Sequence, residues 1–224
     1  MPISRSTVTG LGAGVVLLAG FVGFAVGLPE VVGEGSETAS AELPELPDKL
    51  SDDVVALSAV TPEDADAQNE QDAADIERFT QQVEGSDREA AEHLTSLYDD
   101  ATVRSYVSLD SMTDPQSQGL QTLGVTVVPG DAGLVIPRGP FEINSQGAHY
   151  ELREVDGYRC GVSFSDQTDP TTGMPVEGAE ANAASYQVEC RAERDGLAYS
   201  IFGNGFDEKQ IAGFLDSLLA STEG

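Results

Sequence analysis

The sequence predicts an α+β fold in which an N-terminal transmembrane helix and an acidic stalk precede an antiparallel sheet of four to six strands, packed by an N-terminal and a C-terminal helix. Three observations predict it. No charged residue occurs from Val8 to Leu28, although the 224-residue chain has a formal net charge of −28. After Ala101 the apolar residues recur with the period of two that is typical of half-buried strands. Between Ile211 and Leu219 they return to helical spacing.

The uncharged segment is predicted to cross a membrane. As an α-helix its 21 residues would span about 31 Å, which matches the hydrocarbon core of a bilayer. Arg5 precedes the segment and the next basic residue is Lys49, which favours an N-terminus in the cytoplasm and a C-terminal domain outside. The alternative is a signal peptide cleaved near Ala25-Val26-Gly27, which would release a secreted protein.

The charge of the chain excludes some partners. From Glu30 to Asp100, 21 acidic and 3 basic residues give −18, and from Ala101 onward 18 acidic and 7 basic residues give −11. Phosphate backbones and anionic lipid headgroups repel such a chain, so no nucleic-acid partner is expected. Membrane contact is expected only through residues 8–28, where Gly10 and Gly14 favour a weak helix–helix self-association.

Helices are expected directly after an acidic linker. Residues 29–61 are rich in Glu, Pro, Ser and Ala, which predicts a disordered acidic stalk. Pro62 is favoured at a first helical position and Gly85 favours a helix end, so an acidic helix is predicted over 62–85, with a second one from Ser86 to Tyr98. The predicted organisation is a cytoplasmic N-terminus (1–7), a transmembrane helix or signal (8–28), the stalk (29–61), the acidic helix (62–85) and an extracytoplasmic α+β domain (86–224).

The domain is expected to contain two longer strands, two short ones, two hairpins and a closing helix. Asp207 and Gln210 form a predicted capping box at the start of that helix. Prolines flank the two short strands, which are therefore expected at sheet edges. The four strands before the hairpins are predicted at Thr102–Leu109, Leu120–Val128, Leu134–Ile136 and Phe141–Asn144.

The register of the first hairpin is predicted from its charges. A two-residue loop at Asp156-Gly157 would place Arg153 opposite Cys160 and bring charge onto an apolar face. A three-residue loop instead places Leu152 opposite Cys160, so this register is expected.

The second hairpin leads to the prediction of a disulfide. A two-residue loop at Asp195-Gly196 places Cys190 opposite Ile201. Cys160 and Cys190 then both face the core, and two cysteines in one domain outside the cytoplasm usually oxidise together. We therefore expect a disulfide between them.

Residues that suggest a binding surface are few, and no catalytic, cofactor or metal motif occurs in the sequence. His149 and Glu151 share a strand face, but two ligands do not make a metal site. The stretch Asp166–Glu177 carries Pro170 and Thr171 where a calcium loop needs a ligand and a glycine, so a plain hairpin tip is expected. The candidate binding face, expected on the outward side of the sheet, is His149, Glu151, Arg153 and Arg191.

Three stretches near the C-terminus, GYRCGVSF, YQVECRAERDGLAYSIFG and FDEKQIAGFLDSL, carry a resemblance that covers mostly residues 150–220. Together with the anchor and the Leu-Pro-containing stalk, they resemble uncharacterised exported, membrane-anchored envelope proteins of high-GC Gram-positive bacteria. The resemblance implies an envelope location and supplies no catalytic residues. The expected function is binding of a protein or cell-wall partner, or support of a membrane complex, without a cofactor. The alternatives are a secreted binder or inhibitor and an envelope hydrolase without a recognisable motif.

Overall fold

The computed structural model describes residues 42–114, 117, 119–145, 147–169, 171–176, 178–179 and 181–222, all within one compact unit. The predicted transmembrane segment, residues 8–28, lies outside these residues. Within them, no helix is long and apolar enough to cross a membrane. In chain order the elements are β1 (Val54–Ala56), η2 (Leu57–Ala59), α2 (Glu70–Tyr98), β2 (Thr102–Ser108), α3 (Leu109–Thr113), β3 (Thr122–Pro129), β4 (Ile143–Ser145), β5 (Ala148–Val155), β6 (Tyr158–Ser165), η3 (Ala183–Ser185), β7 (Gln187–Arg194), β8 (Leu197–Asn204) and α4 (Glu208–Ser221).

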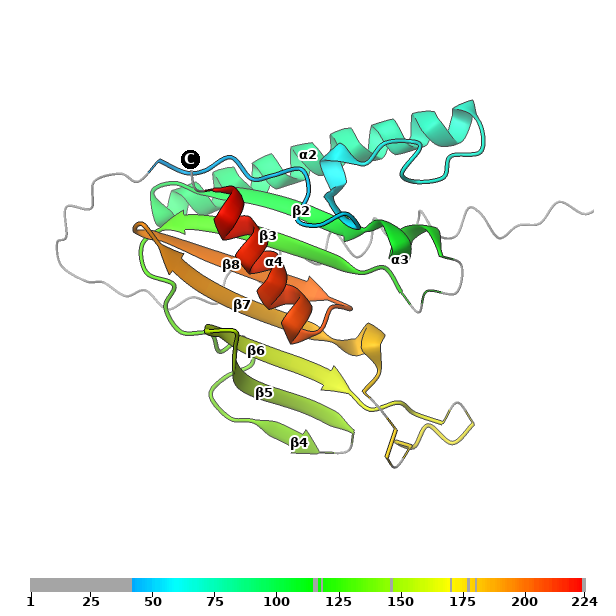
Figure 1. The fold of residues 1–224 in the computed structure, drawn as a ribbon, viewed down its shortest axis with the longest axis vertical. Coiled ribbons are helices and arrows are strands. Elements are labelled where there is room, and N and C mark those ends of the chain that lie inside the picture. The colour runs from blue at the N-terminus through cyan, green and yellow to red at the C-terminus, as the bar shows by residue number, and fades with distance from the viewer. Residues whose placement is uncertain are drawn as a thin grey trace, which may run out of the picture. The chain divides into compact units, whose positions relative to one another are not determined.

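The strands form one antiparallel sheet, which confirms the predicted α+β class (Figure 1). Its order is β1-β2-β3-β8-β7-β6-β5-β4, and every neighbouring pair is antiparallel. The sheet has eight strands, more than the predicted four to six. The connection from 130 to 142 leads from β3 to the far edge, and β8 returns to pair with β3.

Helix α4 covers one face of the sheet, in front of β8 and β7 in Figure 1. It begins with the predicted capping box: Asp207 accepts backbone N–H bonds from Lys209 and Gln210, and the Gln210 side chain accepts one from the Asp207 N–H. Ile211 and Leu215 are fully buried against the strands. Burial of such a side chain contributes about 2 kcal/mol, so the apolar stripe of α4 fixes the helix on this face.

The predicted stalk is wrong over its second half, because that part of the chain lies in the core. Leu46 and Leu50 are buried in the same apolar cluster as α4. The Tyr106 hydroxyl donates to the Pro47 carbonyl at 2.8 Å, and the Arg104 guanidinium donates to the Leu46 carbonyl. These partners lie more than fifty residues away in the sequence, so local composition did not indicate them.

The two predicted helices are one continuous helix, α2, which begins later than Pro62. Asn69 caps it and accepts the N–H groups of Gln71 and Asp72. Gly85 does not end it: the helix runs through Gly85 without a break, and the Ser86 hydroxyl donates to the Gln82 carbonyl at 3.1 Å, one turn before it. A glycine inside a helix costs about 1 kcal/mol, which the rest of a 29-residue helix tolerates.

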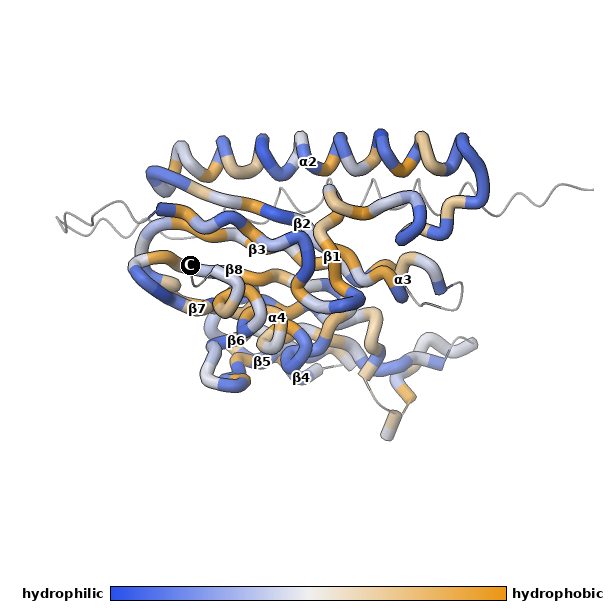
Figure 2. Tube along the Cα trace, turned by 45° about the horizontal axis from the view of Figure 1, so that its top comes forward, coloured by the Kyte–Doolittle hydropathy of each residue, from blue (hydrophilic) through white to orange (hydrophobic). Residues whose placement is uncertain are grey.

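Helix α2 lies on the face opposite α4 and is held loosely there. Asp87 accepts bonds from the N–H and the hydroxyl of Ser105, which projects from the face opposite its neighbour Tyr106. Only Ile76, Val83 and Leu94 of α2 are buried, and Figure 2 shows hydrophilic residues recurring along its whole length.

The short strands are only partly as predicted. Leu134–Ile136 forms no strand; this segment lies on the face opposite α4, where Pro137 packs on Gly161 and Tyr150 is buried. The predicted edge strand Phe141–Asn144 corresponds to β4, which is the last strand of the sheet.

Candidate functional site

The turn between β5 and β6 decides where the candidate residues lie. Asp156 and Gly157 both have positive φ, 51° and 88°, as a two-residue type I′ turn requires. Arg153 therefore lies opposite Cys160, and Glu151 opposite Val162. The predicted three-residue loop is wrong, and Glu151 and Arg153 share the sheet face with α4.

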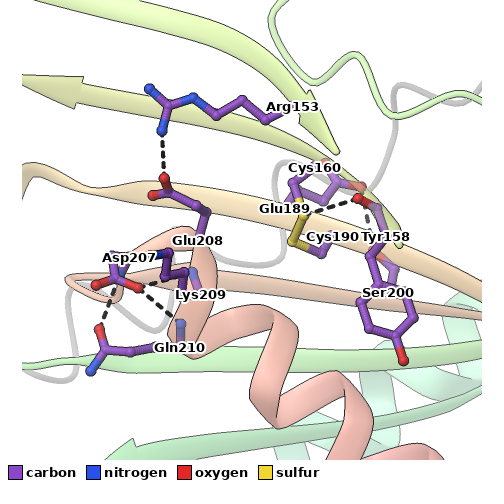
Figure 3. Close-up of a disulfide and its surroundings, with 10 residues drawn as sticks. All are labelled: Arg153, Tyr158, Cys160, Glu189, Cys190, Ser200, Asp207, Glu208, Lys209 and Gln210. Atoms are coloured by element: carbon purple, nitrogen blue, oxygen red, sulfur yellow. Dashed lines mark hydrogen bonds and ion pairs between the residues drawn. A yellow bond between two sulfur atoms is a disulfide. The ribbon is translucent and has the colours of Figure 1, made fainter. Parts of the chain in front are cut away.

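The predicted disulfide between Cys160 and Cys190 is confirmed. The two residues face each other across β6 and β7, with their Cα atoms 4.2 Å apart, as at a non-hydrogen-bonded pair of an antiparallel ladder. Both are buried beside α4 (Figure 3). The neighbouring Tyr158 donates its hydroxyl to Asp216 of α4, and burial raises its pKa to about 12, with the carboxylate adding to the effect.

The charges of β5 are joined to the start of α4. Arg153 pairs with Glu151 of its own strand at 2.6 Å and with Glu208 in the first turn of α4 (Figure 3). Burial disfavours the charged guanidinium, but the two carboxylates outweigh it and raise the pKa of Arg153. The cation is therefore fixed in place and stays charged at every physiological pH.

A column of three rings lies beside this ion pair. His149 stacks on Phe164 with ring centroids 4.6 Å apart, and Phe164 stacks on Tyr186 at 5.2 Å. The Arg153 guanidinium lies 5.9 Å from the Phe164 centroid, within the range of a cation–π contact. His149 Nε2 lies 3.0 Å from Asp166 Oδ1, so this carboxylate orients the imidazole.

We refer to these seven residues as the β5 cluster. All are half-buried. Helix α4 lies in front of β8 and β7 and leaves the same face of β5 and β6 partly open (Figure 1). Its members are His149, Glu151, Arg153, Phe164, Asp166, Tyr186 and Glu208.

Arg191 does not belong to the cluster, which corrects the predicted single binding face. It lies on the opposite face of the sheet and pairs with Glu189 at 2.5 Å. Its guanidinium also donates to the carbonyls of Ala132 and Leu134. Arg191 therefore holds the segment after β3 against the sheet.

Sequence reasoning found three members of the β5 cluster and missed the other four. Phe164 and Tyr186 were not singled out, and Asp166 was only the start of a predicted hairpin tip. The preference of Asp-Gly for a two-residue turn, which the predicted register set aside, would have placed His149 opposite Phe164. Glu208 had no signal, because its role depends on how α4 docks.

The described part of the chain has an open depression but no cluster of metal ligands. An open depression of about 330 Å³ lies beside α3, lined among others by Asp110, Gln121 and Gly205, and His149 is not part of its lining. No group of three or more His, Cys, Asp or Glu in the described ranges is arranged to hold a metal ion. In the loop after β6, Asp169 accepts the N–H groups of Thr171 and Thr172, which lower its pKa and close a tight turn.

The fold and the disulfide thus define the class of protein: an α+β domain with one wide antiparallel sheet and a disulfide that joins the neighbouring strands β6 and β7. Comparison with known proteins places the chain in no family: no family model matches it, and no curated protein or solved structure matches it.

Proposed function

We propose that this chain is a single-pass membrane protein whose folded domain lies outside the cytoplasm and serves as a binding or accessory domain of the cell envelope. The uncharged segment from Val8 to Leu28 supports an anchor, since its 21 residues, apolar or glycine except Thr9, suffice to span a bilayer. Arg5 before it and the acidic residues after it favour the outward orientation of the domain.

The observation that carries the proposal is the disulfide between Cys160 and Cys190. Structural disulfides persist in oxidising compartments and are rare in the cytosol, where thiols are kept reduced. The pair is buried in the core of the sheet, as a structural disulfide is, and this supports a domain that folds in an oxidising compartment.

The β5 cluster supports a binding role. Four of its members lie on β5 and β6, and Arg153 and Asp166 each keep about a third of the side chain exposed. Aromatic and arginine side chains in such settings supply most of the energy of protein interfaces. A partner that packs against Phe164 and Tyr186 would find their positions already fixed by stacking.

Two experiments test the proposal. Alkaline phosphatase, which is active only outside the cytoplasm, is fused after residue 222; activity is expected in cells that carry the full chain. Crosslinking of intact cells, followed by purification of the chain, is expected to yield a discrete adduct. An inactive fusion would overturn the location, and a chain that remains a clean monomer at native expression would overturn the binding role.

A secreted form is the second candidate, favoured by the small-residue triplet Ala25-Val26-Gly27. Mass spectrometry of the mature N-terminus separates the two, because a start near Leu28 requires cleavage.

A further inference from the structure

The two edges of the sheet differ. At β1 the chain covers its own edge: the Ala56 N–H donates to the Asp48 carbonyl, the Leu50 N–H donates to the Val54 carbonyl, and Lys49 bridges to Val55. At the other edge, all three residues of β4 are exposed and no described segment pairs with their outer side.

Backbone groups at this second edge point outward at alternate residues. Ile143 lies opposite Tyr150 and Asn144 opposite His149. The Leu152 N–H points away from β6 and reaches the Glu142 side chain at 3.5 Å, which shows that the even-numbered residues of β5 direct their backbone groups to the edge. In β4, which bonds to those residues through Ile143 and Ser145, the N–H and carbonyl of Asn144 therefore face outward.

Exposed apolar side chains lie at this edge. Ile143 is 44% exposed and lies opposite Tyr150, so it is on the face that carries Tyr150, and Phe141, two residues before β4, is 81% exposed. Leu134, 66% exposed, belongs to the segment that lies on the same face. Exposed apolar groups gathered beside free backbone donors mark an interaction surface rather than a solvated one.

Charge distinguishes between the segments that can add to this edge. The edge segment 141–155 carries Glu142, Glu151 and Glu154 against Arg153, a net charge of −2, and Arg153 is already paired with carboxylates. The whole chain has a net charge of −28, so a second copy would be repelled. A basic segment would be attracted.

We propose that the open edge formed by β4 and the adjoining part of β5 binds an extended segment of a partner protein in which basic and apolar residues alternate. The segment adds a further antiparallel or parallel strand. Its backbone bonds the outward groups of Asn144, its apolar residues cover Phe141 and Ile143, and its basic residues approach the glutamates of the edge. This inference names a partner class for the proposed binding role and rests on that role, but not on the membrane location.

The test measures fluorescence anisotropy of a labelled, end-blocked heptapeptide of alternating Lys and Val, mixed with the purified full chain in neutral detergent. Saturable binding is expected, weakened by salt. A peptide of alternating Glu and Val, and one with the lysines and valines in separate blocks, are expected to bind at least about tenfold more weakly. Equal binding of all three peptides, or no binding of the first, would overturn the proposal.

Variants locate the binding. Asn144→Pro removes an outward N–H that has no partner in the sheet, and proline is tolerated at sheet edges, so the fold is retained while affinity falls about tenfold. Asn144→Ala keeps the backbone N–H and removes the side-chain amide, so it distinguishes the contribution of the backbone to binding from that of the side chain. Glu154→Lys is expected to weaken binding, whereas its matched control Glu92→Lys, on the exposed side of α2, is not. If Asn144→Pro does not fold, Phe141→Ser gives the same test through the apolar contact.

Two further outcomes would overturn the inference and leave the proposed binding role intact. One is a partner that crosslinks to the Asn144→Pro variant in cells as strongly as to wild type. The other is a full chain that is a dimer as wild type and a monomer as Asn144→Pro, because the edge would then bind a second copy.

Discussion

Removal of the disulfide between Cys160 and Cys190 is expected to lower the free energy of unfolding by several kcal/mol. The bond joins residues 30 apart in the sequence. In the chain-entropy model, closure of a loop of this length restricts the unfolded chain by about 12 cal/mol/K, which is about 3.6 kcal/mol at 25 °C. The double variant Cys160→Ala, Cys190→Ala should lose this amount of its free energy of unfolding. For a domain of this size the loss corresponds to a melting temperature lower by about 10 °C.

The assay is urea unfolding of the full chain in neutral detergent, followed by far-ultraviolet circular dichroism. Wild type in dithiothreitol should unfold at the same urea concentration as the double variant, whereas the double variant should not respond to the reductant. A difference below about 1 kcal/mol between oxidised wild type and the double variant would refute the reasoning, because the cross-link would then not restrict the unfolded chain.

Three substitutions test other contacts by the same unfolding assay. Gly85→Ala should stabilise the chain by about 0.5–1 kcal/mol, because no atom lies within 4 Å of the added Cβ in the middle of α2. Gly203→Ala should destabilise it by about 1–3 kcal/mol, because the added Cβ would lie 2.4 Å from Ile211 Cδ1; an effect equal to that at Gly85 would contradict the packing of α4 on β8. Asp87→Asn tests the docking of α2. Burial raises the pKa of Asp87 despite its bonds from Ser105, so its favourable contribution is present in acid and is lost as the pH rises through the raised pKa. The variant should therefore gain stability relative to wild type as the pH rises from about 4, and a difference constant with pH would contradict this.

Elements with strong local signals were predicted correctly. The capping box at Asp207 and Gln210 forms as expected, and the Asp195-Gly196 turn gives the predicted register, with Cys190 opposite Ile201. In both cases the residues that decide the structure are neighbours in the sequence, so the sequence pattern contained the information.

Elements that depend on distant partners were predicted wrongly. Leu46 and Leu50 stand in a stretch whose composition is typical of a disordered segment, but β2 and α4 supply the apolar surface that orders them. Arg153 was placed off the core face because a lone charge there is costly. The structure pairs it with Glu208, which follows 55 residues later, and the cost is offset.

Three of the four residues of the predicted binding face do lie on one face, because all three belong to β5 and strand alternation alone determines their side. His149, Glu151 and Arg153 do share a face, since residues two apart on a strand always do. Arg191 was assigned to the same face through the wrong hairpin register, because a shift of one residue exchanges the two faces of a strand.

The central claim, an anchored domain that is oxidised outside the cytoplasm, is tested most directly by intact-mass measurement. The chain is extracted from carbonate-washed membranes of its own cells and alkylated without reduction. The mass is expected to include the uncharged segment from Val8 to Leu28, with no alkyl group added to Cys160 or Cys190. A chain recovered from washed membranes with both cysteines alkylated, or found only in the soluble fraction, would contradict the account.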